Sequence, residues 1–285
     1  MKGKKRRKII LSVTAALALA ATLTLPGLDN DLVVRTYTVP TEKVSGEITL
    51  AFVSDIHTTV FGENQCELTA AIDAQNPDAV IFGGDMFESV AQAENSDTRE
   101  FMAALAAKYP CAYVTGNHEF YSDGVDRIKE EIREMGVTIL DGNCVTLDVR
   151  AQKINLYGCD DFYVGFQKMT DQSNAAYEKA DPDAFTAFVT HRPRYVEDYC
   201  RFESDLILCG HTHGGLARIP GVLNGLISPE MQLFSDYLGG EYKVGSRTLI
   251  VGRGLTREFR NLPRFYNPPE LVIIKIAPDG ENINK

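Results

Sequence analysis

The sequence predicts an α/β domain in which helices cover β-sheet, and three observations support this fold class. Short apolar runs, typical of buried strands, alternate along the chain with amphipathic stretches typical of helices. In the middle of the chain, consecutive strands are expected without a helix between them. The 285 residues are 44% hydrophobic, which is enough for a sizeable core, so disorder is not expected.

The first half of the chain alternates strand with helix. The run ITLAFVSD at 48–55 is typical of a buried strand, and the amphipathic stretch that follows ends before Pro77, which cannot continue a helix. The helix before Tyr109 carries apolar residues at Phe101 and Leu105. We expect strands at 48–55, 78–85 and 111–118, each followed by a helix, at 65–75, 97–109 and 123–135.

The second half is richer in strands. The turn Asp141-Gly142-Asn143 is expected to join the first two of them as a hairpin. The segment 214–240 is long, apolar and irregular, and is either a substrate lid or a loop packed over the sheet. We expect strands at 137–148, 153–157, 184–191, 205–213, 247–251 and 271–276, with a short helix after Pro193.

The N-terminus has the character of an export signal or a membrane anchor. Residues 1–25 contain six basic residues and no acidic one, and Ile9 to Leu25 is a run of 17 uncharged residues, about 25 Å long as a helix. Ala18-Leu19-Ala20 offers a cleavage site, so a cleaved signal and a retained anchor are both open. The positive-inside rule places everything after this segment on the extracytoplasmic side, as a membrane-bound or exported protein. The expected organisation is a signal or anchor at 1–25, a linker at 26–46 and one catalytic domain at 47–285.

The charge of the chain argues against a nucleic-acid partner, and its cysteines argue against disulfides and a zinc knuckle. After residue 25 the chain has 23 basic and 39 acidic residues, a net charge of −16, so no nucleic-acid partner is expected, and no obligate protein partner is evident. Cys111, Cys159 and Cys209 lie in or beside apolar runs, and we expect free thiols rather than disulfides. No two cysteines have the C-x-x-C spacing of a zinc knuckle.

All five histidines follow directly after a predicted strand. The carboxyl ends of strands in α/β sheets are where ligands bind, so these side chains are expected at one edge. A lone histidine is more often structural, but five of five at strand ends indicate a site. The five are His57, His118, His191, His211 and His213.

Oxygen donors accompany these histidines. Asp55 and His57 are two apart on an expected strand, as are His211 and His213, so each pair is expected to point to one face. The other donors are Asp85 after Gly83-Gly84 and Asn117 after Gly116. Oxygen and nitrogen donors without sulfur suit manganese, zinc or iron. They are too many for one tetrahedral ion, whereas two divalent ions about 3.5 to 4 Å apart, sharing a carboxylate, would use them all.

Such a pair of cations predicts a reaction. Between them a water loses a proton near neutral pH, and the phosphoryl charge that grows in the transition state is neutralised. The resulting hydroxide would attack phosphorus in line with the leaving oxygen. An imidazole with a pKa near 7 can protonate that oxygen.

Five motifs in order resemble the signature blocks of calcineurin-like metallophosphoesterases, over Ile48 to His213. The C-terminal Gly252-Arg253-Gly254 and Arg264-Phe265 are similar to the bacterial membrane-associated branch, which contains phosphodiesterases and relatives of UDP-2,3-diacylglucosamine pyrophosphohydrolases. The motifs are Asp55-x-His57, Gly84-Asp85, Gly116-Asn117-His118-Glu119, a later His191 and Gly210-His211-Thr212-His213.

The resemblance implies a four-layer α/β/β/α sandwich and a role for each residue. Asp85 would bridge the two ions. His118 would not be a ligand but would lie beside the substrate, stabilising the transition state and protonating the leaving oxygen; the alternatives are a ligand or a structural hydrogen bond. The implied ligands are Asp55, His57 and His213 for the first ion and Asn117, His191 and His211 for the second.

The expected function is hydrolysis of a phosphodiester or pyrophosphate, with a lipid-linked or cell-envelope phosphoester as an attractive substrate. Alternatives are a phosphomonoesterase or nuclease of the same family, or a non-catalytic, membrane-tethered binding protein, although every ligand block is filled.

Two further sequence features each allow more than one interpretation. Asp160 and Asp161 either support the site or form a turn. A basic cluster either clamps a second phosphate, faces lipid headgroups or is solvated surface: Arg253, Arg257, Arg260 and Arg264.

Overall fold

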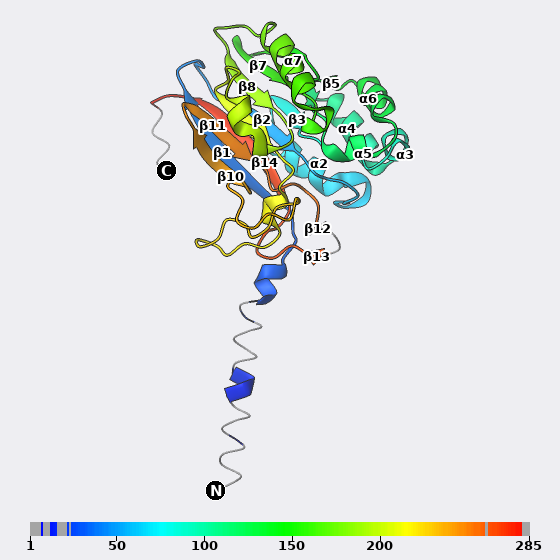
Figure 1. The fold of residues 1–285 in the computed structure, drawn as a ribbon, viewed down its shortest axis with the longest axis vertical. Coiled ribbons are helices and arrows are strands. Elements are labelled where there is room, and N and C mark those ends of the chain that lie inside the picture. The colour runs from blue at the N-terminus through cyan, green and yellow to red at the C-terminus, as the bar shows by residue number, and fades with distance from the viewer. Residues whose placement is uncertain (1–6, 8–11, 16–21, 23, 260–261, 281–285) are drawn as a thin grey trace.

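Two six-stranded sheets form the centre of the molecule (Figure 1). The structure, a computed structural model, describes residues 7, 12–15, 22, 24–259 and 262–280. The first sheet has the order β1 (Val33–Thr41), β14 (Glu270–Pro278), β2 (Ile48–Val53), β3 (Ala79–Phe82), β4 (Cys111–Tyr113) and β5 (Thr138–Ile139). The second has the order β10 (Gly240–Val244), β11 (Arg247–Val251), β9 (Leu206–Cys209), β8 (Phe185–Val189), β7 (Gln152–Gly158) and β6 (Cys144–Val149). A small ribbon pairs β12 (Glu258–Phe259) with β13 (Leu262–Pro263).

The strands that lead to the predicted site are parallel within each sheet. β2, β3, β4 and β5 run parallel in the first sheet, and β7, β8, β9 and β11 do so in the second. Their side chains are buried on both faces, as expected for parallel strands covered from both sides. Parallel strands deliver the loops that follow them to the same edge of a sheet.

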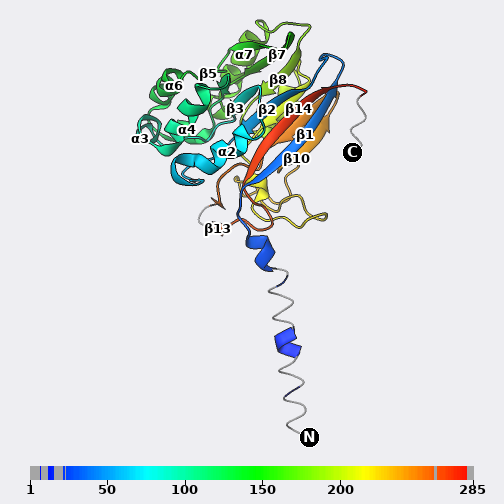
Figure 2. The same cartoon turned by 180° about the vertical axis from the view of Figure 1, so that it is seen from behind.

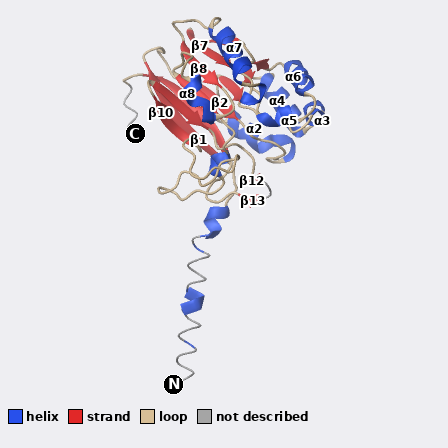
Figure 3. Cartoon of the chain, in the orientation of Figure 1, coloured by secondary structure: helices blue, strands red, loops and turns tan. Residues whose placement is uncertain are grey.

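Helices lie on the outer faces of the two sheets (Figure 3). Leu68, Phe101 and Ile128, on three different helices, share a core with the first sheet. Met169 and Tyr199 share one with the second sheet. The helices are α2 (Cys66–Asp73), α3 (Val90–Glu94), α4 (Asp97–Ala106), α5 (Asn117–Tyr121), α6 (Val125–Glu134), α7 (Phe166–Tyr177) and α8 (Val196–Tyr199), with 3-10 turns η1 (Leu25–Leu28), η2 (Glu63–Gln65), η3 (Phe162–Val164), η4 (Pro193–Tyr195) and η5 (His213–Gly215).

A third core lies between the sheets, where Leu50 and Phe52 of β2 belong to the same apolar cluster as Leu156 of β7 and Leu208 of β9. The molecule is therefore layered helix, sheet, sheet, helix, which confirms the predicted four-layer α/β/β/α sandwich. The helices predicted at 65–75, 97–109 and 123–135 are confirmed as α2, α4 and α6, and the short helix after Pro193 as η4 and α8.

The predicted hairpin around Asp141-Gly142-Asn143 is wrong. That turn separates β5 from β6, which belong to different sheets, so the expected strand 137–148 is two strands. The hairpin forms instead between β6 and β7, across Arg150 and Ala151, which both have a positive φ. An Asp-Gly turn favours a hairpin locally, but here the chain uses it to cross between sheets.

β1 and α7 are among the elements that were not predicted from the sequence. β1 lies within the segment predicted as a linker and pairs in parallel with β14, as Figure 2 shows from behind. α7 buries Met169, Ser173 and Ala176, a face too small and polar to give a clear helical pattern. All six cysteines are free, as predicted, and Cys111, Cys159 and Cys209 are buried.

The predicted signal or anchor at 1–25 lies for the most part outside the described residues. Within the described part of the chain, no helix combines the length and the apolar character that crossing a membrane requires.

Candidate metal centre

The predicted ligands lie just beyond the strands at one edge, and not on the strands themselves; most are on loops, while Asn117 begins α5, so the strand expected at 111–118 ends already at Tyr113. β2 ends at Val53 and β9 at Cys209, so the expectation that each D-x-H and H-x-H pair sits on a strand is wrong. Five of the seven residues instead adopt left-handed backbone: Asp55 (φ 54°), His57 (φ 50°), Asp85 (φ 53°), His211 (φ 69°) and His213 (φ 48°). Such conformations cost about 1 to 3 kcal/mol each and persist where the surrounding structure fixes them, as at binding sites.

Backbone hydrogen bonds hold these loops together. The N–H of Asp55 donates to the carbonyl of Gly84 at 3.0 Å, and that of His57 to the carbonyl of Asp85 at 3.1 Å. Gly116 allows a further close approach, because a Cβ there would lie 2.1 Å from Asp85 Oδ1. The first two motifs are thus fixed to each other and to the third.

Each of the two aspartates has one oxygen fixed by a backbone N–H. His211 N donates to Asp55 Oδ1 at 2.9 Å, and His118 N donates to Asp85 Oδ1 at 2.8 Å. Among the described residues, the other oxygens, Asp55 Oδ2 and Asp85 Oδ2, and the amide oxygen of Asn117 have no hydrogen-bond partner although they are buried. Buried unpaired oxygens are costly, and three together are what a cation would satisfy. The residues present therefore fit divalent ions.

The imidazoles are oriented in the way metal ligands are. His191 donates from Nδ1 to the carbonyl of Gly83 at 2.7 Å, so that Nε2 is the nitrogen that faces Asp85. His57 Nδ1 lies 2.5 Å from Glu88 Oε1, and His211 Nε2 lies 2.6 Å from Glu230 Oε1. Each of the three rings thus has one nitrogen held by an oxygen, and the other remains for a ligand.

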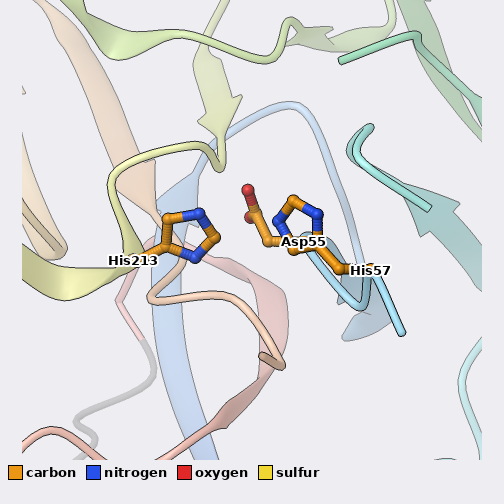
Figure 4. A group of neighbouring side chains, drawn as sticks. All are labelled: Asp55, His57 and His213. Atoms are coloured by element: carbon orange, nitrogen blue, oxygen red, sulfur yellow. The ribbon is translucent and has the colours of Figure 1, made fainter. Parts of the chain in front are cut away.

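Asp85 lies between two groups of candidate ligands. Its Oδ2 is 3.1 Å from His191 Nε2 and 3.9 Å from His57 Nε2, and His191 Nε2 is 3.2 Å from His211 Nδ1. Three groups of three residues each have possible ligand atoms within 4.8 Å of one another: Asp55, His57 and His213; Asp85, His191 and His211; and His57, Glu88 and His118, the last of which keeps a ligand role for His118 open. In the first group the Asp55 carboxylate lies between the two rings (Figure 4).

The electrostatics of the pocket favour positive charge beside the carboxylates. Burial opposes ionisation of Asp85, but His191 and His57 outweigh it and hold the pKa of Asp85 well below its usual value. Burial likewise disfavours charged His191, yet Asp85 and Asp55 raise its pKa. Burial, with the charges of His57 and Arg264, lowers the pKa of His213, so that ring stays neutral and able to bind a metal.

His118 occupies a different position from the other histidines. Its side chain is 32% exposed, and its Nδ1 lies 2.7 Å from Glu88 Oε2. Glu88 therefore holds His118 and His57 with its two oxygens, and the two rings meet edge to face at a centroid distance of 4.6 Å.

A cleft of about 640 Å³ opens over these residues. Six of the eight predicted residues line it, while Asp55 and His191 are fully buried beside their partners. The cleft also contains Glu88, Arg192 and Glu230, which the sequence analysis did not single out. The six are His57, Asp85, Asn117, His118, His211 and His213.

Arg192, which was not predicted from the sequence, brings a guanidinium group to this cleft. Its Nε donates to Asp161 Oδ2 at 2.7 Å, and its NH1 lies 3.6 Å from Glu230 Oε1. Asp161 thus supports the site through Arg192, whereas Asp160 pairs with Lys129 and accepts a hydrogen bond from the Thr115 hydroxyl, two residues before Asn117. The signal in the sequence was only that Arg192 follows His191 directly.

The predicted arginine cluster divides into separate structures. Arg264 is fully buried and donates to backbone carbonyls, among them that of His213 at 2.8 Å, so it fixes the turn that carries this residue. Arg257 lies over the ring of Phe61 at 4.7 Å, and Arg253 faces another pocket. Arg260 lies outside the described residues.

The chain resembles known proteins in sequence. The family model described as calcineurin-like phosphoesterase matches residues 48–215. An uncharacterized metallophosphoesterase of Aquifex aeolicus is 26% identical over 253 residues, which cover 87% of this chain and 92% of the relative. Phosphodiesterase YaeI of Escherichia coli is 26% identical over 217 residues, which cover 72% of this chain and 74% of the relative.

The fold also resembles solved structures. GAP50 of Plasmodium, described as the anchor in the inner membrane complex, superposes with a TM-score of 0.51 at 11% identity, over 82% of each chain. At this identity the likeness concerns the fold alone.

Proposed function

The chain belongs to the calcineurin-like phosphoesterase family, and from that premise we propose that it hydrolyses a phosphodiester or pyrophosphate bond with two divalent cations. The observation that carries the proposal is the set of three buried oxygens without a hydrogen-bond partner among the described residues, on Asp55, Asp85 and Asn117. The proposed ligands are Asp55, His57 and His213 for one ion and Asn117, His191 and His211 for the other, with Asp85 shared.

Divalent cations at this centre would supply Lewis acidity, which acidifies water and neutralises charge on phosphoryl oxygens. The chain's own residues would do the rest. His118 lines the cleft without belonging to either three-residue group around the aspartates, and would protonate the leaving oxygen. Glu88 fixes the orientation of the His118 ring from Nδ1, which leaves Nε2 for the substrate. Arg192 offers a guanidinium for a phosphoryl oxygen.

A diester is favoured over a monoester because the Escherichia coli relative is named a phosphodiesterase. The general acid His118 suits either ester, since both release an alkoxide that needs a proton. A nuclease is disfavoured by the charge of −16 on the chain after residue 25, because neutralising phosphates is the main source of nucleic-acid affinity.

The proposed location is the extracytoplasmic side of the cell membrane, with the domain tethered or exported through residues 1–25. The support is the sequence of that segment, in which six basic residues precede 17 uncharged ones. A lipid-linked or cell-envelope phosphoester is the matching substrate, because a tether would hold the cleft near headgroups.

The test is hydrolysis of bis-p-nitrophenyl phosphate with Mn²⁺, Zn²⁺ or Fe²⁺, together with the metal content of the protein. We expect Asp85→Asn to lose bound metal and to lower the rate by about 100-fold or more, since it removes the shared carboxylate. The matched control is Asp171→Asn, an exposed aspartate of α7 that contacts Gln167. Equal metal content and equal rates in Asp85→Asn and wild type would refute the proposal.

A further inference from the structure

A second pocket, of about 580 Å³, lies beside β1 and the loop that follows η5. The described residues that line it have no member in common with those of the cleft over the metal centre. Three arginines from distant parts of the chain meet in it: Arg35 of β1, Arg218 of the loop and Arg253 after β11.

These arginines carry more positive charge than their partners neutralise. Arg35 Nε and Arg253 Nε lie 3.2 and 3.0 Å from the same oxygen of Glu270, whose side chain is fully buried. Arg218 donates to neutral oxygens, the carbonyl of Gly214 at 3.3 Å and the amide of Asn224. Over these described contacts, three guanidinium groups share one carboxylate, an excess of two positive charges.

The excess charge is partly shielded from water, which makes it costly. The Arg253 side chain is 10% exposed, and burial together with the charge of Arg253 lowers the pKa of Arg218 to about 10. Arginine binds phosphate oxygens with paired hydrogen bonds, so an entering phosphate would relieve the repulsion. An anion with a tetrahedral phosphate group is thus the ligand whose chemistry matches the pocket.

The rim of the pocket is apolar and adjoins the start of the domain. Ile219 and Val222 are 51% and 82% exposed. Tyr266, which also lines the pocket, donates its backbone N–H to the carbonyl of Gly27 at 2.6 Å. A Cβ at Gly27 would lie 2.5 Å from the ring of Phe265, so the chain is packed closely here. The apolar run that ends at Leu25 therefore joins the domain beside the pocket.

We propose that the pocket of Arg35, Arg218 and Arg253 binds the phosphate group of an anionic membrane lipid. The guanidinium groups receive the headgroup phosphate, and the exposed apolar side chains of Ile219 and Val222 lie against the part of the lipid next to it. Such a contact fixes the face of the domain at which the N-terminal segment begins, and so orients the domain on the membrane. That the bound phosphate group belongs to a lipid rests on the proposed membrane location. That the pocket binds a phosphate group does not rest on it.

The test is calorimetric titration of the full chain in neutral detergent with EDTA, so that no phosphate binds through metal. The probes are dihexanoyl phosphatidylglycerol, dihexanoyl phosphatidylcholine and inorganic phosphate. We expect saturable binding of phosphatidylglycerol, at least 10-fold tighter than that of the other two probes. If inorganic phosphate binds as tightly as phosphatidylglycerol, the ligand is not specifically a lipid. If the two lipids bind equally, the proposal as a whole is overturned.

Variants assign the binding to the pocket. Arg35→Gln combined with Arg218→Gln is expected to weaken phosphatidylglycerol binding at least 10-fold, with Arg201→Gln combined with Arg133→Gln, at arginines whose side chains are 63% and 53% exposed, as the charge-matched control. Thermal unfolding checks that the double variant is folded. If it is not, Arg35→Gln alone serves, because the Arg35 side chain is 47% exposed, and unchanged binding in it refutes the assignment. Because this assay contains no metal, its failure leaves the hydrolase proposal untouched.

Discussion

Glu88 holds two imidazoles that have different proposed tasks. Its oxygens lie 2.5 Å from His57 Nδ1 and 2.7 Å from His118 Nδ1. Burial raises the pKa of Glu88, but the hydrogen bonds to both rings, together with their charge, outweigh burial and lower this pKa to about 2. We predict that Glu88→Gln lowers kcat for a diester about 10- to 100-fold. The glutamine amide has a single oxygen, so it can accept a hydrogen bond from only one of the two rings. Steady-state kinetics at saturating metal measure this.

The same variant separates the two tasks of Glu88. If Glu88 acts through His118, Glu88→Gln adds little to the loss already caused by His118→Ala, since residues that act as a unit are not additive. Glu130→Gln, at a residue whose side chain is 61% exposed on α6, is the matched control. Independent, multiplicative losses in the double variant would contradict the assignment of Glu88 to His118.

At the scale of residues, the sequence revealed the donors but not their supports. Histidine and aspartate at strand ends are recognisable because their side chains carry the chemistry of metal binding. Glu88, Arg192 and Glu230 have no such signal, because their contacts depend on where three separate loops pass. The left-handed backbone at Asp55 and His213 was also hidden, since nothing in the residue types distinguishes it from a strand end.

At the scale of elements, the loop that follows η5 contacts a metal-centre histidine through Glu230. Glu230 Oε1 lies 2.6 Å from His211 Nε2, and its side chain is 24% exposed. We predict that Glu230→Ala weakens Mn²⁺ binding about 10- to 100-fold, because the His211 ring loses the acceptor that fixes its orientation. Isothermal titration with Mn²⁺ measures the affinity directly and needs no turnover.

A neighbour in the same loop provides the control for Glu230. Gln232→Ala removes an exposed side chain two residues after Glu230. It leaves in place the hydrogen bond from the Gln232 backbone N–H to the Ser228 hydroxyl. Equal Mn²⁺ affinity in Glu230→Ala, Gln232→Ala and wild type would show that the loop merely packs over the sheet. That outcome would favour a packed loop over a substrate lid, the two possibilities stated from the sequence for residues 214–240.

The elements themselves were predictable where local pattern and tertiary pairing agree. α4 and α6 have apolar residues at helical spacing, and the strands before the ligands are continuous apolar runs. β1 could not be recognised because its partner, β14, lies more than 200 residues away along the chain. The false hairpin at Asp141 has the same cause, since its flanking strands belong to different sheets.

At the scale of the whole molecule, the metal centre is expected to hold the two sheets together. Asp55 and Asp85 follow strands of the first sheet and His191 and His211 follow strands of the second, so cations bound between them would join the two halves. At a free metal concentration about 100-fold above Kd, binding stabilises the folded state by about 2.7 kcal/mol for one site, or roughly 5 to 10 °C in Tm for a domain of this size.

We predict that Mn²⁺ raises the Tm of wild type by at least this amount over EDTA. Asp85→Asn is expected to lose most of the increase in Tm, while Asp171→Asn keeps it. Differential scanning calorimetry provides the measurement, and a Tm that is the same in Mn²⁺ and EDTA would mean that the aspartates beside the first sheet and the histidines beside the second do not share cations.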